Sequence, residues 1–283
     1  MIPNPHQLIG IDFSSSPSRK RPITVATAEW EGQTLRLQSL KKLPKLEEFD
    51  ELLAKPEPFL AAIDMPFGLS RQLVDGLAWP GAQRQDVQAW ADLITFYGKL
   101  SKEEIRATFK AWCDARPPGQ KFAHRKSDKP AGASPSMKWV NPPVAFMLRE
   151  GAPRLLRANL TIPGMHEGDP NRVALEAYPG YLARQVLGRQ SYKTDTPSKD
   201  SADRQMARSE LVCAMEEGML LGTRLSIPKW LRAELLLDPK ADYLDAALCV
   251  LVAASCSRQA GRYFGLPAQI DPVEGWIAGV PWK

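Results

Sequence analysis

Three short apolar stretches of the chain each end on an acidic residue. The acids are Asp12 in LIGIDFSSS, Asp64 in FLAAIDMPFGLS and Glu176 in VALEAYPG. Burying an unpaired carboxylate costs several kcal/mol, so a buried strand that ends on a charge needs a partner or a purpose for it. One such acid is typical of a turn or a helix N-cap, and Glu176 could pair with a nearby arginine. The repetition in three places indicates a site.

A fourth acid follows from the pattern of the last long apolar stretch, DYLDAALCVLVAA. Apolar residues follow Asp245 at the third, fourth and seventh positions, which puts Asp245 on the core-facing side of a helix. Asp242 lies three residues earlier on the same side of that helix. The two acids could instead be a helix-capping pair and nothing more.

Gathered acids favour a particular chemistry because they repel one another. Two carboxylates about 4 Å apart cost on the order of 4 kcal/mol at an effective dielectric constant near 20. Such groups either share protons, with raised pKa values, or are neutralised by a divalent cation. Ligation by carboxylates alone suits Mg²⁺ or Mn²⁺ rather than zinc, and two such ions clamp the attacking and leaving oxygens of a phosphodiester. We therefore expect metal ligation by Asp12, Asp64, Asp242 and Asp245, and catalysis by Asp12, Asp64, Glu176 and Asp245.

The predicted elements bring these acids to one place. The runs LIGIDFSS, ITVATAEWEG and TLRLQSLKKL read as a three-stranded antiparallel meander. The helical stripe of KLEEFDELLAK (45–55) follows, then FLAAID as a fourth strand and RVALEA (172–177) as a fifth. A strand–helix–strand crossover is right-handed and makes the fourth strand parallel to the first or to a near neighbour. With strands one, four and five parallel, the acids meet at the carboxyl edge of one sheet, where open α/β sheets bind ligands.

Residues 70–165 interrupt this pattern and read as a mainly helical insertion. They contain the amphipathic helices RQDVQAWADLITFYG and SKEEIRATFKAWCDA, the second with Ser101 and Glu104 as a capping box, then a proline-rich loop and the short helix VAFMLREG. No flexible linker flanks the insertion, so we expect one domain over residues 1–283. The helices YLARQVLG, 200–218 and KADYLDAALCVLVAASCSRQAG and a strand-like EGWIAGV follow. The predicted class is α/β, a mixed sheet flanked by helices.

The chain resembles domain-of-unknown-function family 429, whose members are described as predicted nucleases of the RNase H fold. The resemblance runs over nearly the whole length and rests on GIDFS, AIDMPFGL, KFAHRKSD, ASPSMKWVNPPVAFML, LEAYPG and DYLDAALCVLVAA with the terminal EGWI. It implies an RNase H-like βββαβ core with an acidic centre of Asp12, Asp64 and Asp245. The pair Asp242 and Asp245 is similar to the pair in Holliday-junction resolvases of this fold, and Glu176 matches the family motif.

The motif HRKSD within the insertion carries a separate expectation about substrate binding. His124, Arg125 and Lys126 would hold a phosphate of the substrate, with Asp128 orienting one of them. The alternative is a solvated basic loop, and SRKR at 18–21 reads in the same way as a solvated turn.

The composition limits the class of protein. A formal net charge of +5 over 283 residues permits an anionic partner such as nucleic acid without demonstrating one. The four cysteines form no CxxC and read as core thiols of a reducing compartment, which speaks against structural zinc. No apolar run reaches the roughly 18 residues of a membrane helix, and MIPNPHQ lacks signal-peptide features, so we expect a cytoplasmic protein. Three tryptophans could stack bases but are more often core residues at helical spacing: Trp90, Trp112 and Trp139.

Three functions fit these residues. The first is a nuclease, a phosphodiester hydrolase that depends on Mg²⁺ or Mn²⁺. The second is a non-catalytic nucleic-acid or protein binding module that kept the fold. The third is an ATPase or phosphotransferase of the actin and sugar-kinase type, whose first strand also begins with GID and a hydroxyl-rich turn. Against the third, Gly68 stands alone after Asp64, with no second glycine-rich phosphate loop.

Overall fold

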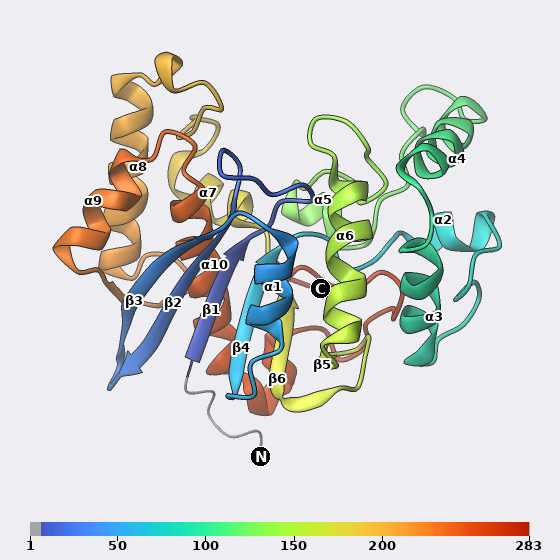
Figure 1. The fold of residues 1–283 in the computed structure, drawn as a ribbon, viewed down its shortest axis with the longest axis horizontal. Coiled ribbons are helices and arrows are strands. Elements are labelled where there is room, and N and C mark those ends of the chain that lie inside the picture. Colours follow the sequence, from blue (N-terminus) through green and yellow to red (C-terminus); the bar gives the residue numbers. More distant parts are fainter. Residues whose placement is uncertain (1–6, 283) are drawn as a thin grey trace.

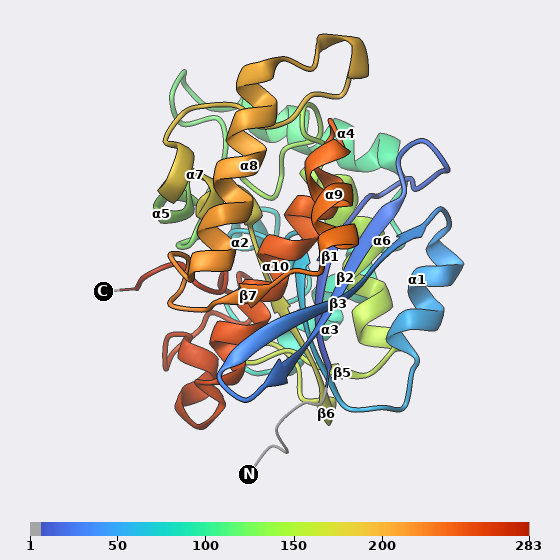
Figure 2. The ribbon, with the colours of Figure 1, turned by 90° about the vertical axis from the view of Figure 1, so that its left-hand side faces the viewer.

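The computed structural model describes residues 7–282, and a seven-stranded mixed sheet forms its centre. The strands are β1 Gln7–Asp12, β2 Ile23–Glu31, β3 Thr34–Leu43, β4 Phe59–Asp64, β5 Leu160–Thr161, β6 Asp169–Glu176 and β7 Leu225–Ser226. Their order across the sheet is β5-β6-β4-β1-β2-β3-β7. Figure 1 shows this order from β5 to β3, and Figure 2 labels β7. β1, β2 and β3 form the predicted antiparallel meander, and β4 and β6 continue the sheet parallel to β1. The predicted α/β class is confirmed, and the arrangement is consistent with an RNase H-like fold.

Helices cover both faces of the sheet, and alternate strand residues supply two separate cores. The helices are α1 Leu46–Leu53, α2 Arg71–Gly76, α3 Gln88–Tyr97, α4 Lys102–Asp114, α5 Asp128–Ala131, α6 Val144–Arg157, α7 Pro179–Leu187, α8 Ala202–Glu217, α9 Lys229–Leu237 and α10 Asp242–Ser257. Ile9 and Ile11 belong to the core shared with α1, α3 and α6, whereas Leu8 belongs to the core shared with α7, α8 and α10. Figure 2 shows α8 and α10 on one side of the sheet and α1 and α6 on the other.

Most of the predicted helices are present, with some differences in extent. Ser101 and Glu104 form the predicted capping box at the start of α4, each side chain accepting from the backbone nitrogen of the other. The short helix expected at VAFMLREG is the first part of the longer α6. Helix α9 was not predicted, because Trp230 and Leu237 stay exposed and blur the apolar stripe of KWLRAELLL.

The strand predicted at EGWIAGV is wrong. Ile277 makes one isolated parallel bridge to Glu176, and Gly275 and Gly279 have positive φ values that turn the chain out of an extended course. Among the cysteines, Cys213 is exposed and the other three are buried, so the expectation of four core thiols holds for three. Residues 1–6, most of MIPNPHQ, lie outside the described part. No helix within residues 7–282 is long and apolar enough to cross a membrane.

Helix α10 crosses β1 at a distance that only a glycine permits. A Cβ atom on Gly10 would lie 2.0 Å from the carbonyl oxygen of Ala246 and 2.4 Å from the backbone nitrogen of Val250. The residues of α10 between Leu244 and Ala254 are all buried, because the helix lies between the sheet and its neighbours α7 to α9. An apolar helix of this kind is expected only where it is enclosed on all sides.

The same packing brings the first turn of α10 to the carboxyl end of β1. Thr24 of β2 lies opposite Asp12 in the sheet, and its hydroxyl donates to the backbone carbonyl of Asp242 at 2.9 Å. Glycine at position 10 therefore determines where the acids of α10 lie relative to the acids of the strands.

Gly10→Ala should destabilise the fold more than an ordinary glycine substitution does. The new methyl group would meet backbone atoms of α10, which cannot move aside as a flexible side chain can, so a loss of about 3 kcal/mol or more in the free energy of unfolding is expected. Denaturant unfolding measures it. Gly261→Ala is the matched control, since a Cβ at Gly261 meets nothing within 4 Å. Equal stability of the two variants would contradict the close contact.

Candidate active site

Two acids stand opposite each other at the carboxyl edge of the sheet. Asp12 ends β1 and Asp64 ends β4, and the two are register partners in a parallel pair. Glu176 ends β6 one level lower, opposite Ile63. Neighbouring strands lie about 4.8 Å apart, so these three acids come from adjacent positions on one edge. Within residues 7–282, no group donates a hydrogen bond to the carboxylate of Asp12 or Asp64, although both side chains are partly buried.

The acid of α10 is held by two residues that sequence reasoning missed. Asp245 is 1% exposed, and it accepts a hydrogen bond from the Tyr192 hydroxyl at 2.6 Å and one from Lys193 Nζ at 2.5 Å. The Lys193 side chain keeps 49% of its surface exposed. Nothing in the local sequence SYKTD signals this contact, because the partner acid lies more than fifty residues further along the chain.

The acids interact strongly through their charges. Burial raises the pKa of Asp12 well above its usual range, and the charges of Asp245 and Asp64 add to the rise. Burial raises the pKa of Asp64 to about 7, and the charge of Asp245 again contributes. Burial also raises the pKa of Asp242 to about 6. Burial opposes the charge of Lys193, but the carboxylate of Asp245 outweighs it, and the pKa of the ammonium is raised well above its usual value.

The idea that Asp242 and Asp245 only cap their helix is wrong. Helix α10 begins at Asp242 after the N-cap residue Ala241, and no side chain caps it. Asp242 instead lines a hollow of about 400 Å³ that it shares with Asp12. Asp245 points to Tyr192 and Lys193. Both acids thus face the carboxyl edge of the sheet.

Glu176 has a different environment from the other acids because an arginine neutralises it. Arg125, which is 2% exposed, makes two contacts of 2.6 Å to the two carboxylate oxygens of Glu176. The backbone nitrogen of Phe67 donates to Glu176 at 2.9 Å. Asp128 is fully buried and accepts from Nε of Arg125 at 3.0 Å. Burial raises the pKa of Glu176, and Arg125 opposes that rise. The alternative in which Glu176 pairs with an arginine is therefore the observed one.

The HRKSD motif divides between this buried cluster and a second hollow. The Arg125 side chain donates hydrogen bonds to Glu176 and to Asp128, so neither Arg125 nor Asp128 is free to hold a phosphate. His124 and Lys126 line a separate hollow of about 480 Å³ together with other basic residues. Of the residues in the motif, Arg125 also lines a hollow of about 320 Å³ beside Asp64. The expected phosphate-binding group of four residues is thus not brought together at the acids.

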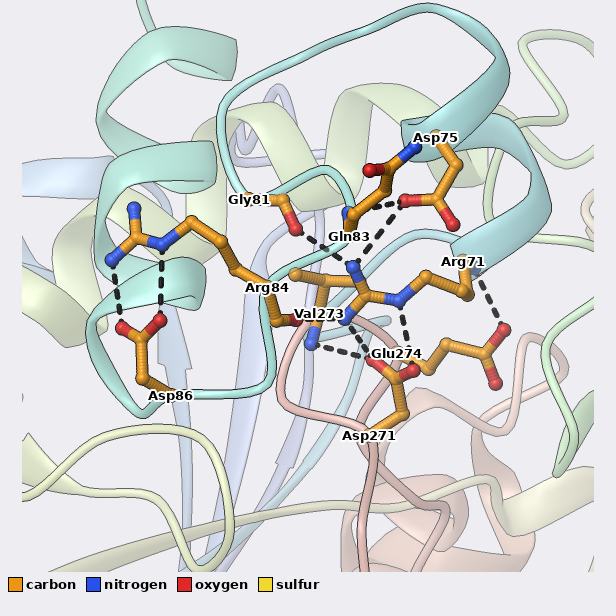
Figure 3. Close-up of polar contacts among 9 residues, drawn as sticks. All are labelled: Arg71, Asp75, Gly81, Gln83, Arg84, Asp86, Asp271, Val273 and Glu274. Atoms are coloured by element: carbon orange, nitrogen blue, oxygen red, sulfur yellow. Dashed lines mark hydrogen bonds and ion pairs between the residues drawn. The ribbon is translucent and has the colours of Figure 1, made fainter.

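A second, partly buried ion pair fixes the turn that follows β4. Arg71 donates to both carboxylate oxygens of Asp271, at 2.9 and 2.7 Å, and to the backbone carbonyls of Gly81 and Arg84 (Figure 3). Glu274 accepts from the Arg71 backbone nitrogen at 2.7 Å. These contacts fasten the C-terminal segment against the start of α2, and so hold the chain that leaves Asp64.

Gly68 belongs to the same contact. A Cβ atom there would lie 2.1 Å from the carbonyl oxygen of Val273, so the C-terminal segment needs a glycine at this position. The glycine of DMPFGL is explained by this approach, and no phosphate-binding loop is needed to account for it.

Two of the three tryptophans that could have stacked bases are core residues. Trp90 is fully buried and its indole nitrogen donates to the carbonyl of Phe67 at 2.7 Å, while Trp112 is 5% exposed. Trp139 is half-buried beside Phe122. Base stacking by Trp90 or Trp112 is excluded by their burial.

The acids do not form a ready-made metal cage. Within the described residues, no group of three or more histidines, cysteines or acids is placed to hold a metal ion. The four-ligand set predicted from the sequence is therefore not assembled as such. Asp12 and Asp64 are left as two adjacent oxygen donors to which no group of residues 7–282 donates a hydrogen bond, and Lys193 supplies the positive charge at Asp245.

Comparison with known proteins gives one match. A family model described as "Protein of unknown function (DUF429)" matches residues 10–270, a span that contains all five acids of the strands and α10. No curated protein and no solved structure matches the chain.

Asp64→Asn should be more stable than the wild type at pH 8 and equal to it near pH 4. The pKa of Asp64 is about 7 in the fold and 3.8 in the reference state, so its protonated form is favoured by folding. That contribution is complete below about pH 4 and is lost as the pH rises through 7, with a slope of up to about 1.4 kcal/mol per pH unit. Denaturant unfolding between pH 4 and 8 measures it.

Asp245→Asn is the contrasting variant. It removes the carboxylate that accepts from Tyr192 and Lys193, so it should lose about 2 kcal/mol at pH 8 rather than gain stability. If the two variants shifted stability in the same direction at pH 8, the division between unpartnered and partnered acids would be wrong.

Glu176→Gln should destabilise the protein by about 3 kcal/mol, because it leaves a buried guanidinium with one charged partner instead of two. Thermal and denaturant unfolding measure the loss. Glu31→Gln is the control, since the Glu31–Arg36 pair is half exposed at 3.5 Å and should contribute less than about 1 kcal/mol. The triple variant Glu176→Leu with Arg125→Met and Asp128→Asn removes the buried charges of both pairs and should recover most of the loss. A triple variant as unstable as the single one would assign the effect to packing.

Proposed function

The chain belongs to the protein family of unknown function DUF429, and we propose that its acidic edge is the active site of a divalent-metal-dependent nuclease. The family assigns no activity, so the proposal stands on the site itself. One observation carries it. Asp12 and Asp64 are register partners at the carboxyl ends of adjacent parallel strands, and within residues 7–282 neither carboxylate has a hydrogen-bond donor.

The residues present fit Mg²⁺ or Mn²⁺ bound in the way these ions prefer. Mg²⁺ is usually held by one or two carboxylates, with waters and substrate phosphates filling its other positions, and not by a cage made of protein alone. Two unpartnered carboxylates therefore suffice, and Asp242 stands in the same hollow as Asp12 as a further oxygen donor. Bound there, the ion would supply neutralisation of the phosphate charge and activation of water.

The chain's own residues then have separate tasks. Asp12 and Asp64 hold the ion at the strand ends. Asp245, fixed by Tyr192, keeps the half-exposed Lys193 ammonium over the same edge, where it would stabilise negative charge that develops on a phosphate. Glu176 is neutralised by Arg125 and forms part of the wall of the site, which is a change from the catalytic role expected for it.

A basic rim supports a polyanionic substrate. The hollow at Asp12 is also lined by Arg21, Lys102 and Lys240. Cations placed beside an acidic centre would contact phosphates on either side of the one that is cut, and the net charge of +5 favours approach of a polyanion. Arg21 of the SRKR turn thus has a place at the site in this proposal.

A second candidate function is favoured by one specific contact. Lys193 lies 2.5 Å from Asp245 and already provides a positive charge among the acids. A site in which lysine is the permanent counterion needs no metal, and such a protein would bind its partner without hydrolysis. The response to metal separates the two candidates.

Millimolar Mn²⁺ or Mg²⁺ should raise the melting temperature of the wild type. An ion that binds only the folded state stabilises it by about 2.7 kcal/mol at a hundredfold excess over its dissociation constant. Asp12→Asn should lose most of the shift, because it removes one of two charged ligands. The exposed acid Glu57 lies on the loop before β4, away from the site, and Glu57→Gln should keep the full shift. Differential scanning fluorimetry measures all three proteins.

Hydrolysis is tested on the same proteins with labelled single-stranded and duplex DNA and RNA. Product should form with Mn²⁺ for the wild type and Glu57→Gln, and should fall by a factor of about 100 or more for Asp12→Asn. The non-catalytic module would instead be supported if Mn²⁺ left the melting temperature of the wild type unchanged and the protein bound nucleic acid without cutting it.

A further inference from the structure

A hollow beside Asp64 differs from the rest of the acidic edge because most of its wall is apolar. It measures about 320 Å³ and lies between the end of β4, the start of α7, the insertion and the C-terminal segment. Its apolar lining includes Met65, Pro142, Val144, Met147, Tyr178 and Ile277. A volume of this size is at the lower end of pockets that hold small organic ligands.

The charged groups that line this hollow are those of the acidic edge. They are Asp64, Lys193 and the buried pair of Arg125 and Glu176. The pair contacts are 2.6 Å each, so the pair has little net charge to offer an ion. A bare phosphate would have to leave water for an apolar wall, which is unfavourable. The occupant that fits is a flat group with apolar faces that is attached to an anion.

One wall of the hollow is an aromatic ring held in a fixed position. The Arg184 guanidinium lies 5.2 Å from the centre of the Tyr178 ring, and its Nη1 donates to the Tyr178 hydroxyl at 3.4 Å. Arg184 is itself anchored by a hydrogen bond to the carbonyl of Ala131. A ring that is already held loses little freedom when a planar group stacks on it.

The hollow is continuous with the proposed reaction centre. Asp64, Lys193 and Tyr178 line this hollow and also the neighbouring hollow of about 230 Å³ on the side of Arg184. A phosphate bound at Asp64 would therefore have the aromatic wall and the apolar 320 Å³ hollow, called the chamber from here on, directly beside it. This is the arrangement that one nucleotide requires, with its charge and its base in different surroundings.

We propose that the 320 Å³ hollow receives the base of an unpaired nucleotide whose phosphate lies at Asp64. The proposal rests on the proposed nuclease function and names its substrate class. A base that enters this chamber has left its stack and its pairing partner. The protein therefore selects single strands, or duplexes with an unpaired nucleotide, over perfect duplexes.

The experiment measures equilibrium binding with Ca²⁺ in place of Mn²⁺, so that binding is separated from hydrolysis. Fluorescence anisotropy is recorded with labelled DNA as a single strand, as its perfect duplex, and as that duplex with one central unpaired nucleotide, together with the matching RNA single strand. The wild type should bind the unpaired forms at least about tenfold more tightly than the perfect duplex, a ratio typical of one stacked base.

Two variants test the chamber and one serves as control. Ser134 lines the hollow and makes no hydrogen bond within the described residues, so Ser134→Trp should fill the space and remove the preference while leaving duplex binding unchanged. Tyr178→Leu keeps an apolar wall without the ring and should reduce the preference by a factor of about five or more. Ala111→Trp places the same bulk on the exposed side of α4 and should change nothing.

The outcomes separate the chamber from the chemistry. A wild type that cuts nucleic acid but binds the perfect duplex as tightly as the unpaired forms would overturn the chamber and leave the nuclease standing. A preference for unpaired nucleotides without hydrolysis in Mn²⁺ would support the chamber and overturn the nuclease. A preference that survives in both Ser134→Trp and Tyr178→Leu, with melting temperatures at the wild-type value, would overturn the chamber, as would failure to bind any of the strands.

Discussion

The acids at one edge of the sheet repel one another, and the surrounding structure reduces this repulsion by placing basic residues beside them. The parallel pairing of β1, β4 and β6 brings Asp12, Asp64 and Glu176 to the same edge, and α10 adds Asp245. Two basic residues compensate for part of this charge. Arg125 comes from the insertion to neutralise Glu176, and Lys193 comes from the loop after α7 to meet Asp245. The long ordered loops thus deliver counter-charges to an edge that the sheet and α10 make acidic.

The negative charge of Glu176 and Asp245 is compensated by basic partners, whereas within residues 7–282 that of Asp12 and Asp64 is not. This difference separates the structural acids from the candidate functional ones. Glu176 is enclosed by Arg125, Phe67 and the C-terminal segment, where the loss of one partner would leave a buried charge. Asp12 and Asp64 receive no hydrogen bond from residues 7–282 and keep raised pKa values. Groups whose ionisation the fold disfavours are typical of functional sites, and a structural role would have been served better by neutral side chains.

The acidic edge was predictable because its causes are local. Apolar strand patterns and the handedness of a strand–helix–strand crossover suffice to bring Asp12 and Asp64 together. The partners of the acids were not predictable, since Tyr192 and Lys193 reach Asp245 from a loop with no pattern of its own. The burial of Arg125 in HRKSD was equally hard to predict. A run of charged residues is typical of a solvated loop, and the sequence does not show that Arg125 pairs with Glu176, which lies 51 residues away.

The ion pair and hydrogen bonds that join Arg71 to the C-terminal segment have a consequence for the time course of folding. Asp271 and Glu274 are 200 and 203 residues beyond Arg71, yet they hold the turn by which the chain leaves Asp64. At about 5 to 20 residues per second, a ribosome needs roughly 10 to 40 s to make that intervening stretch. Contacts of such long sequence separation also form late in refolding, because loop closure must precede them. The acidic edge is therefore completed only after residues 271–274 have been synthesised, and a growing chain carries Asp12 and Asp64 long before their final geometry exists.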